Sequence, residues 1–154
     1  MTSPQQVSWQ QLAQQAEGLL SVSSYHIANA ANLSELMYQE LPDVSWVGFY
    51  FLNDKKLLLG PFQGKPACVS IEMGKGVCGT AASTGETLRV ADVEAFEGHI
   101  ACDPQARSEV VVPLFKSGEL LGVLDVDSTS LARFTEEDEA GLKLLAQVYL
   151  SSIA

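Results

Sequence analysis

The chain has few basic residues, few cysteines and no long apolar run. Its 154 residues include 9 Lys and Arg against 19 Asp and Glu, which gives a formal net charge of −10. Such a surface repels phosphate groups, so we expect neither a nucleic acid nor a membrane as partner. No apolar run is long enough to span a membrane, and the N-terminal residues do not resemble a signal peptide. These absences favour a cytoplasmic protein.

The three cysteines, Cys68, Cys78 and Cys102, do not follow a metal-binding pattern. No C-x-x-C pair is present, and His26 and His99 lie too far apart to complete a zinc site, so we expect no metal. Structural disulfides are rare in the cytoplasm, which leaves buried packing residues or a redox set. Cys102 is unusual, because cysteine usually packs inside and this one lies in the polar segment HIACDPQARSE.

Hydrophobic periodicity predicts helices at both ends of the chain and strands between them. The expected helices cover 7–22, 24–41, 74–86 and a C-terminal segment that begins after Thr135, which with Asp138 resembles a capping box. The expected strands cover 44–51, 56–62, 67–73, 87–93, 109–115 and 119–127. Short turns between consecutive strands favour an antiparallel sheet. The sequence therefore predicts an α+β fold.

Acidic residues alternate with apolar ones at the end of the last predicted strand. Because side chains alternate across a strand, Asp125 and Asp127 share a face, about 7 Å apart. An ordinary solvated face explains them slightly better than the rim of a pocket. Glu109, at the start of the preceding strand, is unremarkable by itself.

Two large rings flank a glycine in the first predicted strand, SWVGFYF. Trp46, Gly48 and Tyr50 share one face, and the apolar alternate residues should face the helices: Val47, Phe49 and Phe51. The glycine leaves space between the rings, which could form the wall of a ligand site. Packing in the core is the commoner outcome for such rings.

Together these segments resemble a known family. SWVGFYF, GKGVCGTAA, HIACDPQARSE, GVLDVDS and the cysteine spacing are similar to those of the free methionine-(R)-sulfoxide reductases, which are stand-alone GAF proteins. The resemblance covers almost the whole chain. It implies a single GAF domain over 1–154, with an antiparallel sheet of about six strands. The N- and C-terminal helices would pack on one face, and loops and a short helix on the other.

The resemblance also implies a reaction and a role for each cysteine. Free methionine (R)-sulfoxide would be reduced without a cofactor, through a sulfenic acid and an intramolecular disulfide that thioredoxin recycles. Cys102 would be the nucleophile, Cys68 the resolving cysteine and Cys78 a secondary, backup thiol. GAF domains commonly pair through their end helices, which suggests a homodimer.

The remaining site residues implied by the resemblance are aromatic or acidic. Trp46 and Tyr50 would contact the methyl and thioether end of the substrate, and Glu109, Asp125 and Asp127 its ammonium and sulfoxide. Crowded carboxylates raise one another's pKa, so one can act as a general acid. We assign that role to Asp127 or Glu109, and the ammonium to Asp125.

Two other functions stay open at this stage. One is a non-catalytic GAF sensor for a small ligand such as a cyclic nucleotide. The other is a redox sensor in which Cys68 and Cys102 form a regulatory disulfide without turnover. Three cysteines have no purpose in nucleotide binding, which weighs against the first.

Overall fold

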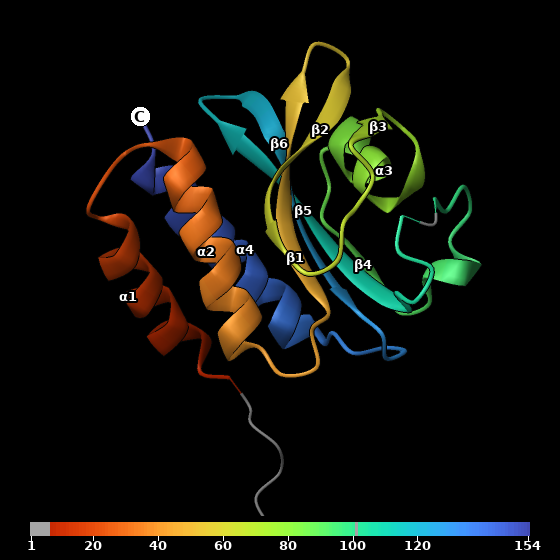
Figure 1. Cartoon of the computed structure of the whole chain (residues 1–154), viewed down its shortest axis with the longest axis horizontal. Coiled ribbons are helices and arrows are strands. Elements are labelled where there is room, and N and C mark those ends of the chain that lie inside the picture. Colours follow the sequence, from red (N-terminus) through yellow and green to blue (C-terminus); the bar gives the residue numbers. More distant parts are fainter. Residues whose placement is uncertain (1–6, 101) are drawn as a thin grey trace, which may run out of the picture.

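A six-stranded antiparallel sheet forms the centre of the molecule (Figure 1). The computed structural model describes residues 7–100 and 102–154. The strands are β1 (Trp46–Asn53), β2 (Lys56–Gln63), β3 (Ser70–Glu72), β4 (Leu88–Val90), β5 (Ser108–Lys116) and β6 (Glu119–Ser128). They lie in the order β3-β2-β1-β6-β5-β4, and each neighbouring pair is antiparallel. The predicted α+β architecture is confirmed.

Long helices lie on one side of this sheet and a short helix on the other (Figure 1). The long helices are α1 (Trp9–Leu20), α2 (His26–Glu40) and α4 (Glu136–Ser152). The short helix α3 (Gly76–Thr84) packs on β5 and β6 from the opposite side, and a single 3-10 turn, η1 (Val93–Ala95), follows β4. This confirms the predicted placement of the end helices. None of the described helices is long and apolar enough to cross a membrane.

Local sequence signals set where the long helices begin and end. Ser8 accepts a hydrogen bond from the backbone N–H of Gln11 at the start of α1. Thr135 and Asp138 form the predicted capping box at the start of α4. The helix α2 ends at Glu40, two residues before Pro42, which cannot continue a helix.

The sheet separates two hydrophobic cores. In β1, Val47 and Phe49 enter the core under the long helices, whereas Trp46 and Tyr50 enter the core beside α3. This alternation confirms the predicted division of the strand into two faces. The second core also contains Cys78, and Cys68 and Cys102 pack against it from its edge, so the chemistry concentrates on the α3 side.

The strand β3 is shorter than predicted, and this changes the position of a cysteine. The expected strand covered 67–73, but β3 comprises Ser70–Glu72 and pairs with β2 through three residues. Upstream, Pro66 has no N–H to donate and Gly64 has a φ of 128°, so the chain leaves the sheet there. Cys68 consequently lies in the loop between β2 and β3, not in a strand.

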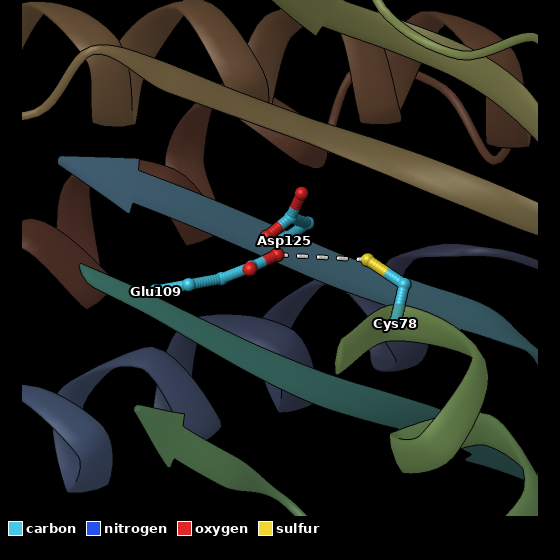
Figure 2. Close-up of side chains that lie close together, drawn as sticks. All are labelled: Cys78, Glu109 and Asp125. Atoms are coloured by element: carbon cyan, nitrogen blue, oxygen red, sulfur yellow. Dashed lines mark hydrogen bonds between the residues drawn. The ribbon is translucent and has the colours of Figure 1, made fainter. Parts of the chain in front are cut away.

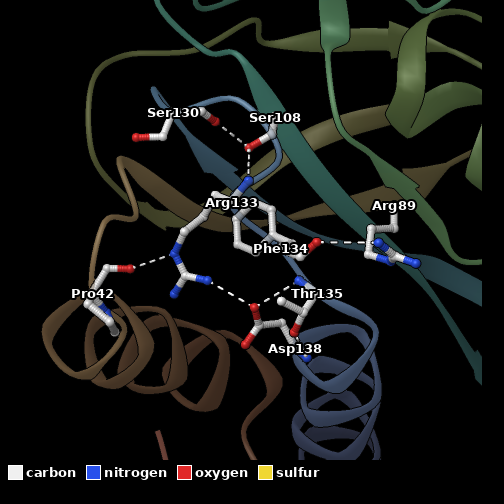
Figure 3. A network of polar contacts seen from close by, with 8 residues as sticks. All are labelled: Pro42, Arg89, Ser108, Ser130, Arg133, Phe134, Thr135 and Asp138. Carbon is white, nitrogen blue, oxygen red and sulfur yellow. Dashed lines mark hydrogen bonds and ion pairs between the residues drawn. The ribbon is translucent and has the colours of Figure 1, made fainter. Parts of the chain in front are cut away.

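A polar network around Arg133 links the start of β5 to the segment before β1 and to the start of α4 (Figure 3). Arg133 donates from Nε to the carbonyl of Pro42 at 2.9 Å and forms an ion pair with Asp138, also at 2.9 Å. The backbone N–H of Arg133 donates to the Oγ of Ser108 at 3.3 Å. Because Ser108 directly precedes Glu109, this network fixes the strand end that carries a predicted site residue.

Candidate functional site

Strand register brings the predicted acids and rings together on the α3 side of the sheet. Trp46 of β1 lies opposite Asp127 of β6, which in turn lies opposite Glu109 of β5. Two residues further along, Gly48 lies opposite Asp125. Antiparallel partners directly opposite each other point to the same face, so three neighbouring strands contribute to one site.

A cavity of about 50 Å³ lies over these rows. Its walls come from β1, β3, β5, β6, the start of α3, and the loops that precede β3 and β5. All the predicted site residues except Cys68 line it: Trp46, Tyr50, Cys78, Cys102, Glu109, Asp125 and Asp127. His99 also lines the cavity, whereas His26 lies on the helix side of the sheet against Phe51.

Trp46 and Tyr50 form the aromatic wall of the cavity, and Phe62 supports it by stacking on Trp46. Trp46 lies 5.9 Å from Tyr50 and 5.2 Å from Phe62, both in stacked geometry, and its Nε1 donates to the carbonyl of Lys65. A Cβ atom added at Gly48 would lie 2.6 Å from the Trp46 ring. The space expected between the two rings is therefore filled by the Trp46 ring itself, which corrects the prediction of an open gap there.

Asp125 and Asp127 are both buried, so the prediction that they lie on a solvated face is wrong. Asp125 is 4% exposed and Asp127 8% exposed, because α3 and the loop before β5 cover them. Each keeps one Oδ1 atom without a hydrogen-bond partner among the described residues. Burial raises the pKa of Asp125, as do the charges of Asp127 and Glu109, and burial together with Glu109 raises the pKa of Asp127.

Cys78 points from α3 at this acidic cluster (Figure 2). Its thiol donates to a carboxylate oxygen of Glu109 at 3.8 Å. Burial, and then the charges of Asp125 and Glu109, raise the pKa of the thiol. The ligand atoms of these three residues lie within 4.8 Å of one another, close enough for a metal ion. Metal ligands must be deprotonated, however, and the raised pKa values of Cys78 and Asp125 oppose this.

A disulfide joins the two loop cysteines. Cys68, before β3, is bonded to Cys102, before β5, with their Cα atoms 5.3 Å apart. The resemblance implied this pair. Cys102 is half-buried and lines the cavity, so its sulfur has access both to the cavity and to a partner thiol on another loop.

Sequence reasoning missed residues of the cavity and one residue behind it. Phe62 does not line the cavity but stacks on Trp46, which does. Phe62 lies opposite Gly48 across the β1–β2 hairpin, and the register of that hairpin was the signal that could have found it. Ile100 and Ala106 flank the Cys102 loop, and no pattern in the sequence marked them. The segment between η1 and β5 lacks periodicity, so its inward-facing residues could not be read from spacing.

Comparison with known proteins agrees with this fold. The GAF domain family matches residues 30–153. The free methionine-R-sulfoxide reductase of Escherichia coli K12 is 51% identical over 131 residues, which cover 84% of this chain and 79% of that protein. The Neisseria meningitidis enzyme of the same name, solved in complex with its substrate, is 40% identical with a TM-score of 0.90, and the alignment covers 94% and 87% of the chains.

A third structure, fRMsr of Staphylococcus aureus in complex with substrate, is 43% identical with a TM-score of 0.93 over 99% of this chain and 100% of that one. Fold and site thus define a GAF domain that carries a cysteine pair beside a buried acidic cluster. Within that class, the chain belongs to the free methionine-R-sulfoxide reductase family.

Proposed function

We propose that this chain reduces free methionine (R)-sulfoxide to methionine, with Cys102 as the nucleophile. The observation that carries this proposal is the position of Cys102, which is bonded to Cys68 and lines a cavity walled by rings and carboxyl groups. The cysteine pair, the ring wall and the acids are the parts that sulfoxide reduction needs. The family relatives named above support the same substrate.

In the first step, the Cys102 thiolate attacks the sulfoxide sulfur while the oxygen gains a proton. The oxygen passes to the cysteine, which becomes a sulfenic acid, and methionine leaves. The sulfoxide sulfur gains two electrons and the cysteine sulfur loses two. Cys102 and the substrate supply every atom of this exchange apart from the proton, so no cofactor takes part.

In the second step, the Cys68 thiol condenses with the sulfenic acid and releases water. This gives the disulfide between Cys68 and Cys102. An external dithiol, which we propose is thioredoxin, then reduces the disulfide and restores both thiols. A cycle that depends on such a reductant suits the cytoplasm.

The acids divide between proton donation and recognition. Asp127 and Glu109 lie opposite each other across β6 and β5, so their carboxyl groups can share a proton and deliver it to the departing oxygen. Burial and the charge of Glu109 raise the pKa of Asp127, which favours its protonated, proton-donating form. Asp125, which lies opposite Gly48 and two residues before Asp127 in β6, would bind the substrate ammonium.

The aromatic residues provide the apolar part of the site. Trp46 and Tyr50 are buried, stacked and adjacent to the acids, so they can enclose the methyl and thioether groups. Burial and the charge of Asp125 raise the pKa of the Tyr50 phenol, which therefore stays protonated. A residue inside a peptide has no free ammonium to pair with the acids, so we expect no repair of oxidised proteins.

We also propose that residues 1–154 form one GAF domain that pairs as a homodimer. The N-terminal helices α1 and α2 and the C-terminal helix α4 share one hydrophobic core with the sheet, which supports the single domain. Apolar residues exposed on the end helices, Leu19 and Leu144, support the pairing.

The test combines free methionine sulfoxide with thioredoxin, thioredoxin reductase and NADPH. We expect NADPH consumption in proportion to the R epimer, and none with a methionine-sulfoxide peptide. A ligand sensor would show no NADPH consumption that rises with the amount of substrate. A redox sensor would consume one equivalent for its disulfide and then stop, which would contradict the proposed turnover.

A further inference from the structure

Phe62 of β2 contacts the aromatic wall of the site but does not line the cavity. It is half-buried, packs against the core beside α3, and lies opposite Gly48 in the register of β1 and β2. Its ring stacks on Trp46, with the centroids 5.2 Å apart and the planes 15° from parallel. The proposed function gives Phe62 no role, and the following inference rests on that function.

The Trp46 ring is held along its edges by the backbone of two strands and a loop. A Cβ atom at Gly48 would lie 2.6 Å from the benzene part of the indole, and one at Gly64 would lie 2.6 Å from its pyrrole part. The indole therefore occupies the space that a side chain would take at either position. Its Nε1 donates to the carbonyl of Lys65 at 3.0 Å, and rotation of the ring would break this hydrogen bond.

The flat faces of the indole are held by other rings. Trp46 is stacked with Tyr50 at 5.9 Å and with Phe62 at 5.2 Å. Tyr50 lines the cavity, whereas Phe62 lies behind the wall and does not. A ligand that presses on Trp46 from the cavity would push the indole towards Phe62, so Phe62 is the support that resists this movement.

A small displacement of such a wall changes which alkyl group fits against it. Protein interiors are closely packed, and one methylene more or less in an apolar pocket changes kcat/KM by about 10- to 200-fold. The cavity itself is small, about 50 Å³. Truncation of Phe62 would leave a void behind Trp46, and the indole could move into it and leave room for a longer alkyl group.

We propose that Phe62 limits the substrate to S-methyl sulfoxides: by holding Trp46 in place, it excludes a free amino acid that carries an S-ethyl group. Phe62 is a positioning residue, because it acts through Trp46 and lies outside the cavity. The size limit is thereby set from β2, a strand that contributes no residue to the lining of the cavity.

The experiment compares free methionine sulfoxide with free ethionine sulfoxide, which has one more methylene on sulfur. In the thioredoxin-coupled assay, the wild-type kcat/KM should favour methionine sulfoxide by about 10- to 200-fold. Phe62→Ala should reduce this preference by about tenfold or more, and Phe62→Leu, which fills more of the space, by a smaller factor. On methionine sulfoxide itself, Phe62→Ala should raise KM while kcat stays within about threefold of the wild-type value.

Leu88→Ala is the matched control. Leu88 of β4 is also half-buried against the core beside α3, but β6 and β5 separate its strand from β1. This variant should lose stability and keep the wild-type preference between the two sulfoxides. Circular dichroism checks that each variant folds, and Phe62→Leu decides the result if Phe62→Ala does not fold.

The outcomes distinguish this inference from the proposed function. A wild-type protein that reduces neither sulfoxide would overturn both. Reduction of methionine sulfoxide with the same preference in the wild type and in the Phe62 variants would overturn the size limit alone. Equal reduction of the two sulfoxides by the wild type would also overturn it, as would an equal loss of preference in Leu88→Ala.

Discussion

The two faces of the sheet bury polar groups in opposite ways. On the helix side, the buried Asn29 donates to the carbonyl of Ser23 and to Ser152, and the Tyr149 hydroxyl donates to the carbonyl of His26. On the α3 side, Asp125 and Asp127 are equally buried, yet one oxygen of each has no partner in the described part of the chain. Among the described residues, the buried groups of Asn29 and Tyr149 are therefore paired, whereas one oxygen of each β6 aspartate is not.

This difference indicates that the two faces serve different ends. Paired polar groups stabilise the fold, whereas crowded carboxyl groups with raised pKa values destabilise it at neutral pH. Functional sites commonly lower the stability of the proteins that carry them. Substitutions on the α3 side should therefore alter chemistry, and substitutions on the helix side should alter stability.

The largest effect should come from the nucleophile on the α3 side. Cys102→Ser should lower kcat by at least about 1,000-fold, because a serine hydroxyl is a far weaker nucleophile than a thiolate. The thioredoxin-coupled assay measures this. Full activity in Cys102→Ser would move the chemistry to another residue and remove the basis of the comparison.

The next largest effects on activity should come from the acidic residues of the site. Asp127→Asn and Glu109→Gln should each lower kcat by about 100- to 10,000-fold, because each removes a possible proton donor. Asp125→Asn should mainly raise KM, since we assign this residue to the substrate ammonium. Steady-state kinetics separate the two parameters. Loss of turnover in Asp125→Asn with normal affinity would reverse this assignment.

On the helix side, the expected effect is on stability. Leu142 is fully buried in the core beneath the long helices, so Leu142→Ala should cost about 2–5 kcal/mol of unfolding free energy. Urea denaturation measures the loss, and kcat per folded molecule should stay at the wild-type value. A tenfold fall in that kcat would show that the two faces are coupled.

The smallest expected effect is a pH-dependent gain in folding stability. Folding raises the pKa of Asp125, so its carboxyl group stabilises the fold below its unfolded pKa of about 3.9, and this contribution is lost as the pH rises through the folded value. An asparagine carries no charge at either pH. The unfolding free energy of Asp125→Asn, measured by urea denaturation, should therefore exceed that of the wild type by on the order of 1 kcal/mol at pH 8 and by almost nothing near pH 4. An equal gain at both pH values would exclude ionisation as the cause.

Much of the fold could be predicted because its signals are local. The alternation in β1 placed Trp46 and Tyr50 on one face, and the capping box at Thr135 marked the start of α4. The limits of β3 could not be predicted, because its apolar pattern continues through Cys68 while its pairing with β2 stops at Ser70. Pairing depends on another strand, which a local pattern does not contain.

The site was only partly predictable for the same reason. Period-two spacing put Asp125 and Asp127 on one face, but their burial depends on α3 and on the loop before β5, which cover them from elsewhere in the sequence. The resemblance supplied the cysteine pair that spacing alone left open. The environment of Cys78 could not be predicted either, because it depends on β5 and β6, which are distant in sequence and pack against α3.

The central claim is that Cys102 and Cys68 supply the two electrons that reduce the substrate. One measurement addresses it directly: react the reduced wild-type protein with one equivalent of free methionine (R)-sulfoxide, digest it without reductant, and map its sulfurs by mass spectrometry. The account predicts one methionine per chain, one Cys68–Cys102 disulfide and an unmodified Cys78. Methionine release with Cys102 still a free thiol, or with Cys78 in the disulfide, would contradict it.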